Sequence, residues 1–125
     1  MTIHESGEDY LETILMLCKQ YGYARSVDIA SHLGVSKPSV SFAMKKLREN
    51  GYILMGDDNR ITLTNAGEAI AGRVLERHVI LSTLLMRLGV SEETARVDAC
   101  KIEHDLSDES FDAIRRHLQA HPQAQ

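Results

Sequence analysis

Apolar side chains recur at helical spacing from the start of this 125-residue chain. A stripe with i, i+3, i+4, i+7 spacing predicts a helix from about Glu8 to Tyr21, because that spacing places all its members on one buried face. The members are Leu11, Ile14, Leu15 and Cys18. Gly22 is expected to end this helix, since glycine readily adopts the left-handed conformation that is common after a last helical turn.

Two short helices joined by a tight turn are predicted next. Ser26 is the expected N-cap of the first, which stops at Gly34, and Ser36 is the expected N-cap of the second. Pro38 falls in the first turn of the second helix, where proline is tolerated, and that helix runs to Asn50-Gly51. This layout is typical of a helix-turn-helix.

The rest of the chain predicts a small hairpin and three further helices. In YILMGDDNRITLT, two runs with strand propensity flank turn-forming residues, as in the wing of a winged helix. A long helix is expected from Asn65 to just before Gly89, another from Ser91 to Leu106, and a last one from Ser107. The predicted fold is mainly α: a winged helix-turn-helix domain with a small β-hairpin wing, residues 1–72, plus a helical dimerisation domain, residues 73–125.

Dimerisation is predicted from apolar side chains that exceed what one small core can cover. They are Val79, Leu84, Leu85, Leu88 and Phe111. An intramolecular helical bundle that buries the same residues is the alternative.

Length and composition exclude several classes of protein. A chain of this size is too short for a large substrate-holding enzyme, and it has no apolar stretch long enough to span a membrane. The acidic, polar start MTIHESGEDY lacks the features of a secretory signal, so a cytoplasmic location is expected. Cys18 and Cys100 are far apart and form no CxxC pair, which predicts reduced thiols rather than a disulfide or a zinc ribbon.

The net charge of −4 conceals a basic middle segment. Residues 24–77 contain eight Lys and Arg against six acids, whereas both flanks are acidic. Basic side chains on the second short helix, before the first and on the wing are expected to contact phosphates, while the N-terminal part of the second helix reads base edges. The candidate DNA-binding residues are Arg25, Ser36, Lys37, Pro38, Ser39, Ser41, Phe42, Lys45, Lys46, Arg48 and Arg60. The alternatives are a merely solvated basic face and, for Phe42, packing against the wing.

Three of the predicted helices, namely the first helix, the long helix and the helix that follows it, carry side chains of types that bind metals. Two carboxylates are spaced i, i+3 on the first helix, a thiolate, a carboxylate and an imidazole are spaced i, i+3, i+4 on a later one, and one imidazole lies on the long helix. Each group alone has an ordinary structural explanation, but together they form a mixed N, O and S set suited to a divalent first-row ion. The candidate ligands are Asp9, Glu12, His78, Cys100, Glu103 and His104.

Five segments, taken together, resemble the diphtheria toxin repressor and manganese transport regulator family: EDYLETILML, IASHLGVSKPSVSFAMKKLRENGYI, LTNAGE, RHVILSTLL and DACKIEHDLS. The likeness runs from about Glu8 to Leu118, and IEH with its upstream partner and RH are its specific elements. The resemblance implies a homodimer on double-stranded operator DNA, with the six candidate ligands joining the first helix to the dimerisation helices. It implies no membrane partner and no organic small-molecule substrate, and no SH3-like third domain is predicted.

The candidate ligands leave open whether the bound metal is Mn(II) or Fe(II). The Asp9 and Glu12 pair resembles the manganese-responsive branch of the family, whereas a cysteine at the position of Cys100 resembles the iron-responsive branch. Hard carboxylates favour Mn(II), and the softer thiolate favours Fe(II), with Co(II), Ni(II) and Zn(II) possible in vitro. The iron branch's ancillary site is not reproduced beyond His78, since Ser82 and Arg96 stand where ligands would be expected.

The predicted function is a metal-dependent repressor of metal-ion homeostasis, activated by Mn(II) or Fe(II). The bound ion is expected to relieve carboxylate repulsion and so to restrict the spacing of the two recognition helices of a dimer. One alternative is a metal-independent winged-helix regulator. The other, a small metallohydrolase, is disfavoured because the sequence has no HExxH, nucleophile elbow or glycine-rich phosphate loop, so no enzyme activity is expected.

Overall fold

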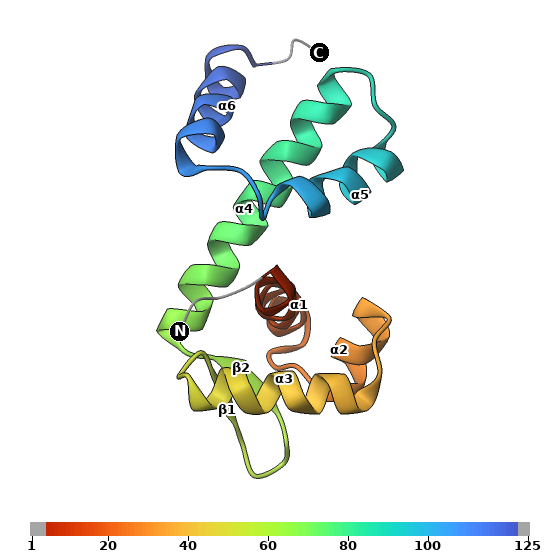
Figure 1. Cartoon of the computed structure of the whole chain (residues 1–125), viewed down its shortest axis with the longest axis vertical. Coiled ribbons are helices and arrows are strands. Elements are labelled where there is room, and N and C mark those ends of the chain that lie inside the picture. The colour runs from red at the N-terminus through yellow and green to blue at the C-terminus, as the bar shows by residue number, and fades with distance from the viewer. Residues whose placement is uncertain (1–4, 123–125) are drawn as a thin grey trace. The chain divides into compact units, whose positions relative to one another are not determined.

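The computed structural model describes residues 5–122 as two compact units that divide after Arg73. The first unit contains five complete elements and the start of a long helix (Figure 1). They are α1 (Glu5–Tyr21), α2 (Ser26–Leu33), α3 (Lys37–Glu49), β1 (Ile53–Met55), β2 (Ile61–Leu63) and the first part of α4 (Asn65–Arg87). The predicted mainly helical fold with a small hairpin is therefore confirmed.

The core of the first unit is formed by the helical stripes seen in the sequence. Leu11, Ile14 and Leu15 of α1 are buried, as the spacing predicted. They are joined by apolar side chains of α2, α3 and the hairpin. These are Ile29, Ala30, Val40, Met44, Leu47, Ile53 and Ile61. Cys18 continues the α1 stripe half-buried, and its thiol lies 3.7 Å from the carbonyl oxygen of Ile61.

The turn between α2 and α3 has the predicted geometry, with one shift at its start. Gly34 adopts a left-handed conformation after α2, and the Ser36 side chain caps α3 by accepting from the N–H of Ser39 at 3.2 Å. Ser26, however, is the first residue of α2 rather than its N-cap. The cap is Arg25, in extended backbone, and it makes no side-chain cap bond. The shift follows from the residue before it, because Ala24 is paired to β2 and holds the chain extended up to the helix.

The wing is the predicted antiparallel hairpin, with Ile53 opposite Leu63 and Met55 opposite Ile61. Asn59 closes its tip at a φ of 63°, a left-handed conformation that asparagine adopts more readily than most residues. The hairpin has a partner that the sequence did not reveal. Ala24, in the loop after α1, exchanges two backbone hydrogen bonds with Ile61, at 2.9 and 2.8 Å. The α1–α2 loop is thereby fixed to the wing.

Gly67 allows the first turn of α4 to pack against the hairpin. A Cβ at this position would overlap the carbonyl oxygen of Tyr52 and would lie 3.3 Å from a methyl group of Leu63. We expect Gly67→Ala to lower the free energy of unfolding by about 1–3 kcal/mol, because a backbone carbonyl cannot rotate away as a flexible side chain can.

Gly72 on the same helix supplies a matched control, since nothing lies within 4 Å of a Cβ built there. Gly72→Ala should stabilise the protein by up to about 1 kcal/mol, through the better helix propensity of alanine. Urea denaturation followed by circular dichroism measures both variants. Equal shifts in the same direction would contradict the proposed close approach at Gly67.

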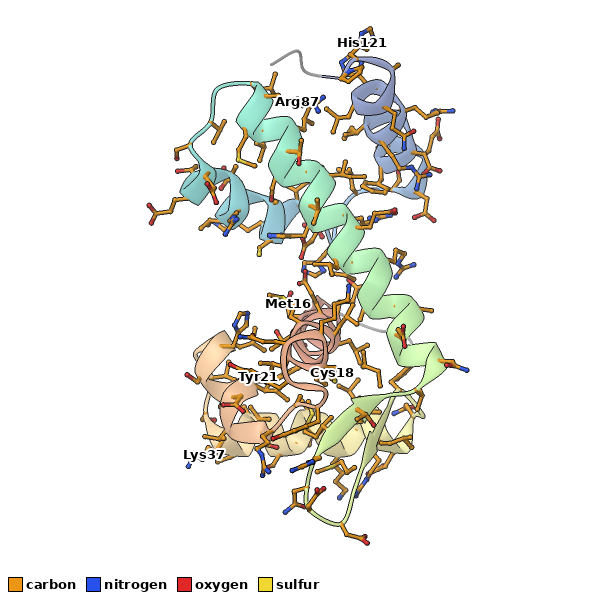
Figure 2. All side chains as sticks on the ribbon, turned by 180° about the vertical axis from the view of Figure 1, so that it is seen from behind. Met16, Cys18, Tyr21, Lys37, Arg87 and His121 are labelled. Atoms are coloured by element: carbon orange, nitrogen blue, oxygen red, sulfur yellow. The ribbon has the colours of Figure 1, made fainter. Side chains whose placement is uncertain are left out.

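The second unit is formed by the remainder of α4, α5 (Glu92–Ile102) and α6 (Asp108–Ala120). Figures 1 and 2 both show this part of α4 with α5 on one side and α6 on the other. Arg87, near the end of α4, donates to the carbonyl oxygen of His121, just beyond α6, at 3.1 Å (Figure 2). No described helix is both long and apolar enough to cross a membrane.

A buried arginine organises the connection between α5 and α6. The Arg77 guanidinium donates to the carbonyl oxygens of Glu103 at 3.1 Å and of Leu106 at 2.6 Å, and it pairs with Asp108 at 2.5 Å. Its carbon also lies 5.1 Å from the centre of the Phe111 ring. One side chain of α4 thus satisfies carbonyl groups that the connecting turn leaves outside any helix.

Two predictions for the second unit were wrong. The helix that begins after the N-cap Ser91 ends at Ile102 rather than at Leu106. Beyond it the chain turns, and the carbonyl groups of Glu103 and Leu106 both accept from Arg77. Phe111 was expected on a dimerisation surface but is only 4% exposed. It forms part of the core of this unit, next to Arg77 and Arg115.

Candidate metal centre and nucleic-acid interface

The second unit brings together three candidate ligands of different chemistry. His78 Nδ1 of α4 lies 3.0 Å from Glu103 Oε2 and 3.7 Å from Cys100 Sγ. Nitrogen, oxygen and sulfur donors of these three residues all lie within 4.8 Å of one another. Although Glu103 is the residue after α5, its N–H still bonds to the carbonyl of Ala99 at 2.9 Å, so it remains one helical turn beyond Cys100. The early end of the helix therefore does not separate the two side chains.

His104 joins the same group through the second carboxylate oxygen. Its Nε2 lies 3.5 Å from Glu103 Oε1, so the two oxygens of Glu103 face one imidazole each. Glu103 is 2% exposed. A carboxylate is rarely buried to this extent without positive partners or a metal, because removing its charge from water is costly. Glu103 thus lies at the centre of the candidate cluster, between His78 and His104.

The electrostatics favour a metal-binding form of the histidine. Burial, and secondly the charge of Arg96, lowers the pKa of His78 below its usual value. At neutral pH the ring is therefore mostly uncharged and offers a lone pair, as metal ligation requires. Imidazole, thiolate and carboxylate together are a set that a divalent first-row ion accepts, so the residues present fit such an ion.

The remaining two candidate ligands lie in the first unit. Asp9 and Glu12 are three residues apart on α1, which places their side chains on adjacent positions of one helix face. The structure thus places four of the six candidates in one cluster of the second unit and the other two together on α1.

The candidate DNA-binding residues of α3 and its cap are all exposed. The buried side chains of this helix point to the core of the unit, which leaves the basic and hydroxyl side chains on the opposite surface. The exposed set is Ser36, Lys37, Pro38, Ser39, Ser41, Phe42, Lys45, Lys46 and Arg48. Lys37 lies at the start of α3 (Figure 2), and Ser36 Oγ, besides capping the helix, bonds to Ser39 Oγ at 2.9 Å.

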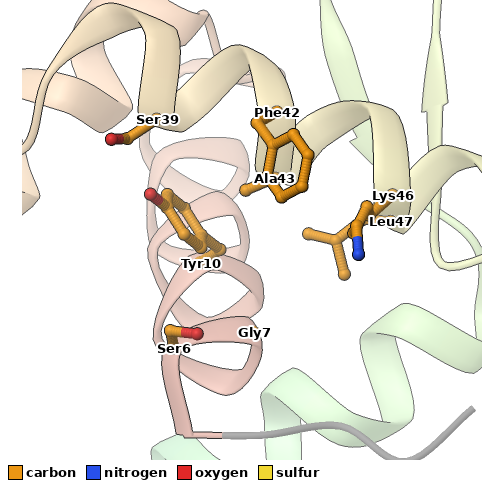
Figure 3. A pocket seen from close by; sticks show the side chains of 8 residues that line it. All are labelled: Ser6, Gly7, Tyr10, Ser39, Phe42, Ala43, Lys46 and Leu47. Carbon is orange, nitrogen blue, oxygen red and sulfur yellow. The ribbon is translucent and has the colours of Figure 1, made fainter.

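Phe42 is 63% exposed, so it does not pack against the wing. The Nζ of Lys46 lies 5.0 Å from the centre of its ring, within range of a cation–π interaction. Phe42 also borders a hollow of about 370 Å³ between the start of α1 and α3, with Tyr10 on the α1 side (Figure 3). An exposed aromatic ring of this kind on a candidate recognition helix can make an apolar contact to a thymine methyl group.

Arg25 and Arg60 are also exposed, but both contact the same aromatic side chain. Both guanidinium groups lie over the ring of Tyr23, which the sequence analysis had not singled out. The role of Arg77 was missed in the same way, although this residue belongs to the RH element of the family resemblance. Only the tertiary packing shows what Tyr23 and Arg77 contact.

A winged helix-turn-helix with an exposed basic second helix, followed by a helical unit that gathers nitrogen, oxygen and sulfur donors, defines a metal-responsive DNA-binding regulator. Comparison with known protein families leads to the same class of protein. Residues 2–58 match the iron dependent repressor, N-terminal DNA binding domain, and residues 64–124 match the iron dependent repressor, metal binding and dimerisation domain. The chain belongs to the iron-dependent repressor family and is a transcriptional repressor rather than an enzyme. The predicted resemblance is confirmed.

Individual relatives extend the match. The chain is 44% identical over 114 residues to the transcriptional regulator MntR of Escherichia coli O157:H7, covering 91% of this chain and 74% of the relative. It is 40% identical over 109 residues to the HTH-type transcriptional regulator MntR of Bacillus subtilis strain 168, covering 87% and 77%.

Solved structures give the same fold. The structure of T. acidophilum IdeR superposes with a TM-score of 0.83 at 28% identity, and that of the manganese regulator SloR with 0.81 at 28% identity. In both cases the match covers 95% of this chain and 55% of the other, so the chain spans little more than half the length of these two structures.

Proposed function

We propose that this chain is a manganese-responsive repressor that binds double-stranded operator DNA as a homodimer when its metal site is filled. The observation that carries the proposal is the convergence of His78, Cys100 and Glu103, whose ligand atoms lie within 4.8 Å of one another. An isolated carboxylate or cysteine has many explanations, but three different donor types around one point serve a metal ion well.

The proposed ligand set contains all six predicted residues. His78, Cys100, Glu103 and His104 are supplied by the second unit. We propose that Asp9 and Glu12 of α1 complete the set, because two carboxylates on one helix face match the preference of Mn(II) for oxygen. A bound dication supplies positive charge that offsets the mutual repulsion of three carboxylates. The first helix of the DNA-binding domain and the dimerisation domain would then be held in one relative arrangement.

Mn(II) is the first choice of metal and Fe(II) the second. Carboxylates are three of the six proposed ligands, and the similar SloR is described as a manganese regulator. Cys100 favours Fe(II), because a thiolate is a softer ligand than Mn(II) prefers. The iron-responsive alternative is therefore supported by this side chain and by the description of both matching family models as iron dependent repressor domains.

The homodimer is proposed to form through residues 73–125, with residues 1–72 as the DNA-binding domain. Part of the predicted apolar surface stays accessible in the second unit, where Val79 is 54% and Leu88 72% exposed. The match of residues 64–124 to a dimerisation domain supports the same assignment. The cytoplasm is the proposed location, because operator DNA must be accessible to the protein.

A binding experiment that resolves the metals tests this function. Operators are selected from a random duplex library with Mn(II), with Fe(II) under exclusion of oxygen, and with chelator alone, and affinity is measured under each condition. We expect Mn(II) to increase DNA affinity about 5- to 150-fold, the usual range for coupled sites. By the same linkage, operator DNA should tighten Mn(II) binding by an equal factor.

A result of equal DNA affinity in metal and in chelator would contradict the proposal and favour a metal-independent regulator. A larger increase with Fe(II) than with Mn(II) would keep the repressor function but reverse the order of metals. If the chain bound no duplex under any condition, both the metal-dependent repressor and the metal-independent regulator would be rejected.

A further inference from the structure

Tyr23 gathers two arginines that are distant in sequence. The guanidinium carbon of Arg60, on the wing, lies 4.1 Å from the centre of the Tyr23 ring, and that of Arg25, just before α2, lies 5.3 Å from the same centre. Both distances are within the range of a cation–π interaction. The loop after α1 and the wing therefore share one aromatic contact.

The backbone makes this arrangement a built feature rather than a chance meeting of exposed side chains. Ala24, between Tyr23 and Arg25, exchanges two hydrogen bonds with Ile61, the residue after Arg60. Ala24 and Ile61 are both buried. Each of the three side chains is thus adjacent in sequence to a residue of this fixed bridge.

The arrangement brings like charges together. The two distances to one ring centre limit the separation of the guanidinium carbons to roughly 9 Å, within the range where charges at a protein surface still interact. Asp58 pairs with the Nε of Arg60 at 3.0 Å and also accepts from its backbone N–H at 3.1 Å. One carboxylate thus holds the wing arginine from one side, while the Tyr23 ring holds it from another.

Two arginines at this spacing suit a phosphate backbone. Successive phosphates on one DNA strand are separated by about 3.4 Å along the helix axis, so a pair of guanidinium groups this close can reach the same phosphate or neighbouring ones. Arginine hydrogen-bonds phosphate through its planar fork, and its affinity increases when the fork is already oriented. A ring that fixes both side chains lowers the entropy lost on binding.

We propose that Tyr23 is a positioning residue that combines Arg25 and Arg60 into one phosphate clamp on the operator backbone. The inference rests on the proposed DNA-binding function and adds a residue and a mechanism to it. The clamp contacts phosphate only, so it strengthens binding to any duplex and carries no sequence preference.

The test uses the full chain with Mn(II) and compares two Tyr23 variants. Tyr23→Leu replaces the aromatic ring by a smaller apolar side chain, whereas Tyr23→Phe keeps the ring. We expect Tyr23→Leu to weaken operator and random-duplex binding by the same factor, about 2- to 30-fold, the range that cation–π contacts provide. The slope of log affinity against log salt should fall by about 1–2, since each lost phosphate contact removes about 0.9. Tyr23→Phe should match the wild type in both respects.

Three controls separate this role from a structural one. Tyr21→Leu changes an exposed tyrosine at the end of α1, whereas Tyr23 is half-buried, and it should leave the salt slope unchanged. In a background of Arg25→Ala and Arg60→Ala, Tyr23→Leu should cause no further change. Thermal unfolding establishes that each variant is folded, and if Tyr23→Leu is not, the single and double arginine variants carry the test, because a shared clamp makes their effects on affinity non-additive.

The outcomes are distinguishable from failure of the proposed function. If the wild type did not bind duplex DNA, the proposed repressor function itself would be rejected. A wild type that binds, with a Tyr23→Leu variant of unchanged salt slope, would overturn the clamp alone. Additive effects of the two arginine substitutions would overturn it as well.

Discussion

Replacing Glu103 by glutamine is expected to weaken Mn(II) binding by more than about 100-fold, since changes outside the ligand shell alone commonly cost 10- to 100-fold. The carboxylate lies at the centre of the candidate cluster, with one oxygen 3.0 Å from His78 and the other 3.5 Å from His104. A carboxamide has the same shape but lacks the charge that attracts a dication. The variant should therefore keep its fold and its dimer while losing metal-dependent DNA binding.

Isothermal titration with Mn(II) measures the affinity of this variant, and sedimentation reports the dimer. Glu93→Gln is the matched control, because Glu93 is exposed in the first turn of α5 and its replacement makes the same chemical change away from the cluster. Its Mn(II) affinity should equal that of the wild type. Unchanged affinity in Glu103→Gln would remove Glu103 from the proposed ligand set.

Periodicity and local caps made most of the fold predictable. The stripe on α1, the glycine after α2 and the serine caps of α3, α5 and α6 are signals confined to a few neighbouring residues, and the structure confirms them. The hairpin followed in the same way from strand propensity around a turn. Local sequence suffices where the interactions that fix an element lie within one or two turns of it.

The errors fall where distant residues decide the local structure. No glycine or proline marks the end of α5 at Ile102. The carbonyl oxygens of Glu103 and Leu106 beyond it instead accept hydrogen bonds from Arg77, which is far away in sequence. The start of α2 shifted by one residue because Ala24 pairs with Ile61. Neither pairing leaves a periodic pattern in the sequence.

The candidate metal cluster was predictable in part for the same reason. The spacing of Cys100, Glu103 and His104 identified a shared region, but not that Glu103 would face one histidine with each oxygen. That arrangement depends on how the segment after α5 turns. Arg77 holds this segment through the backbone carbonyl of Glu103 itself, so one side chain contributes both to the packing of the second unit and to the position of Glu103.

Replacing Arg77 by methionine is accordingly expected to lower the free energy of unfolding by about 2–4 kcal/mol, because it leaves the carbonyl groups of Glu103 and Leu106 without their donor. Methionine retains much of the apolar stem but provides no hydrogen bond. The ion pair with Asp108 adds little to this loss, since Asp108 is largely exposed and water screens it. Thermal and urea denaturation of the chain without metal measure the effect.

Arg116→Met is the control for this prediction, because Arg116 is exposed on α6 and its replacement should change stability by no more than about 0.5 kcal/mol. Arg77→Lys should recover only part of the loss, since a single ammonium group cannot reproduce the planar fork that reaches two carbonyls and a carboxylate. A positioning role also predicts weaker Mn(II) binding in Arg77→Met, although no proposed ligand has been altered. Equal stability of the Arg77 and Arg116 variants would show that water replaces the guanidinium without cost, and the connection between α5 and α6 would then owe its shape to other contacts.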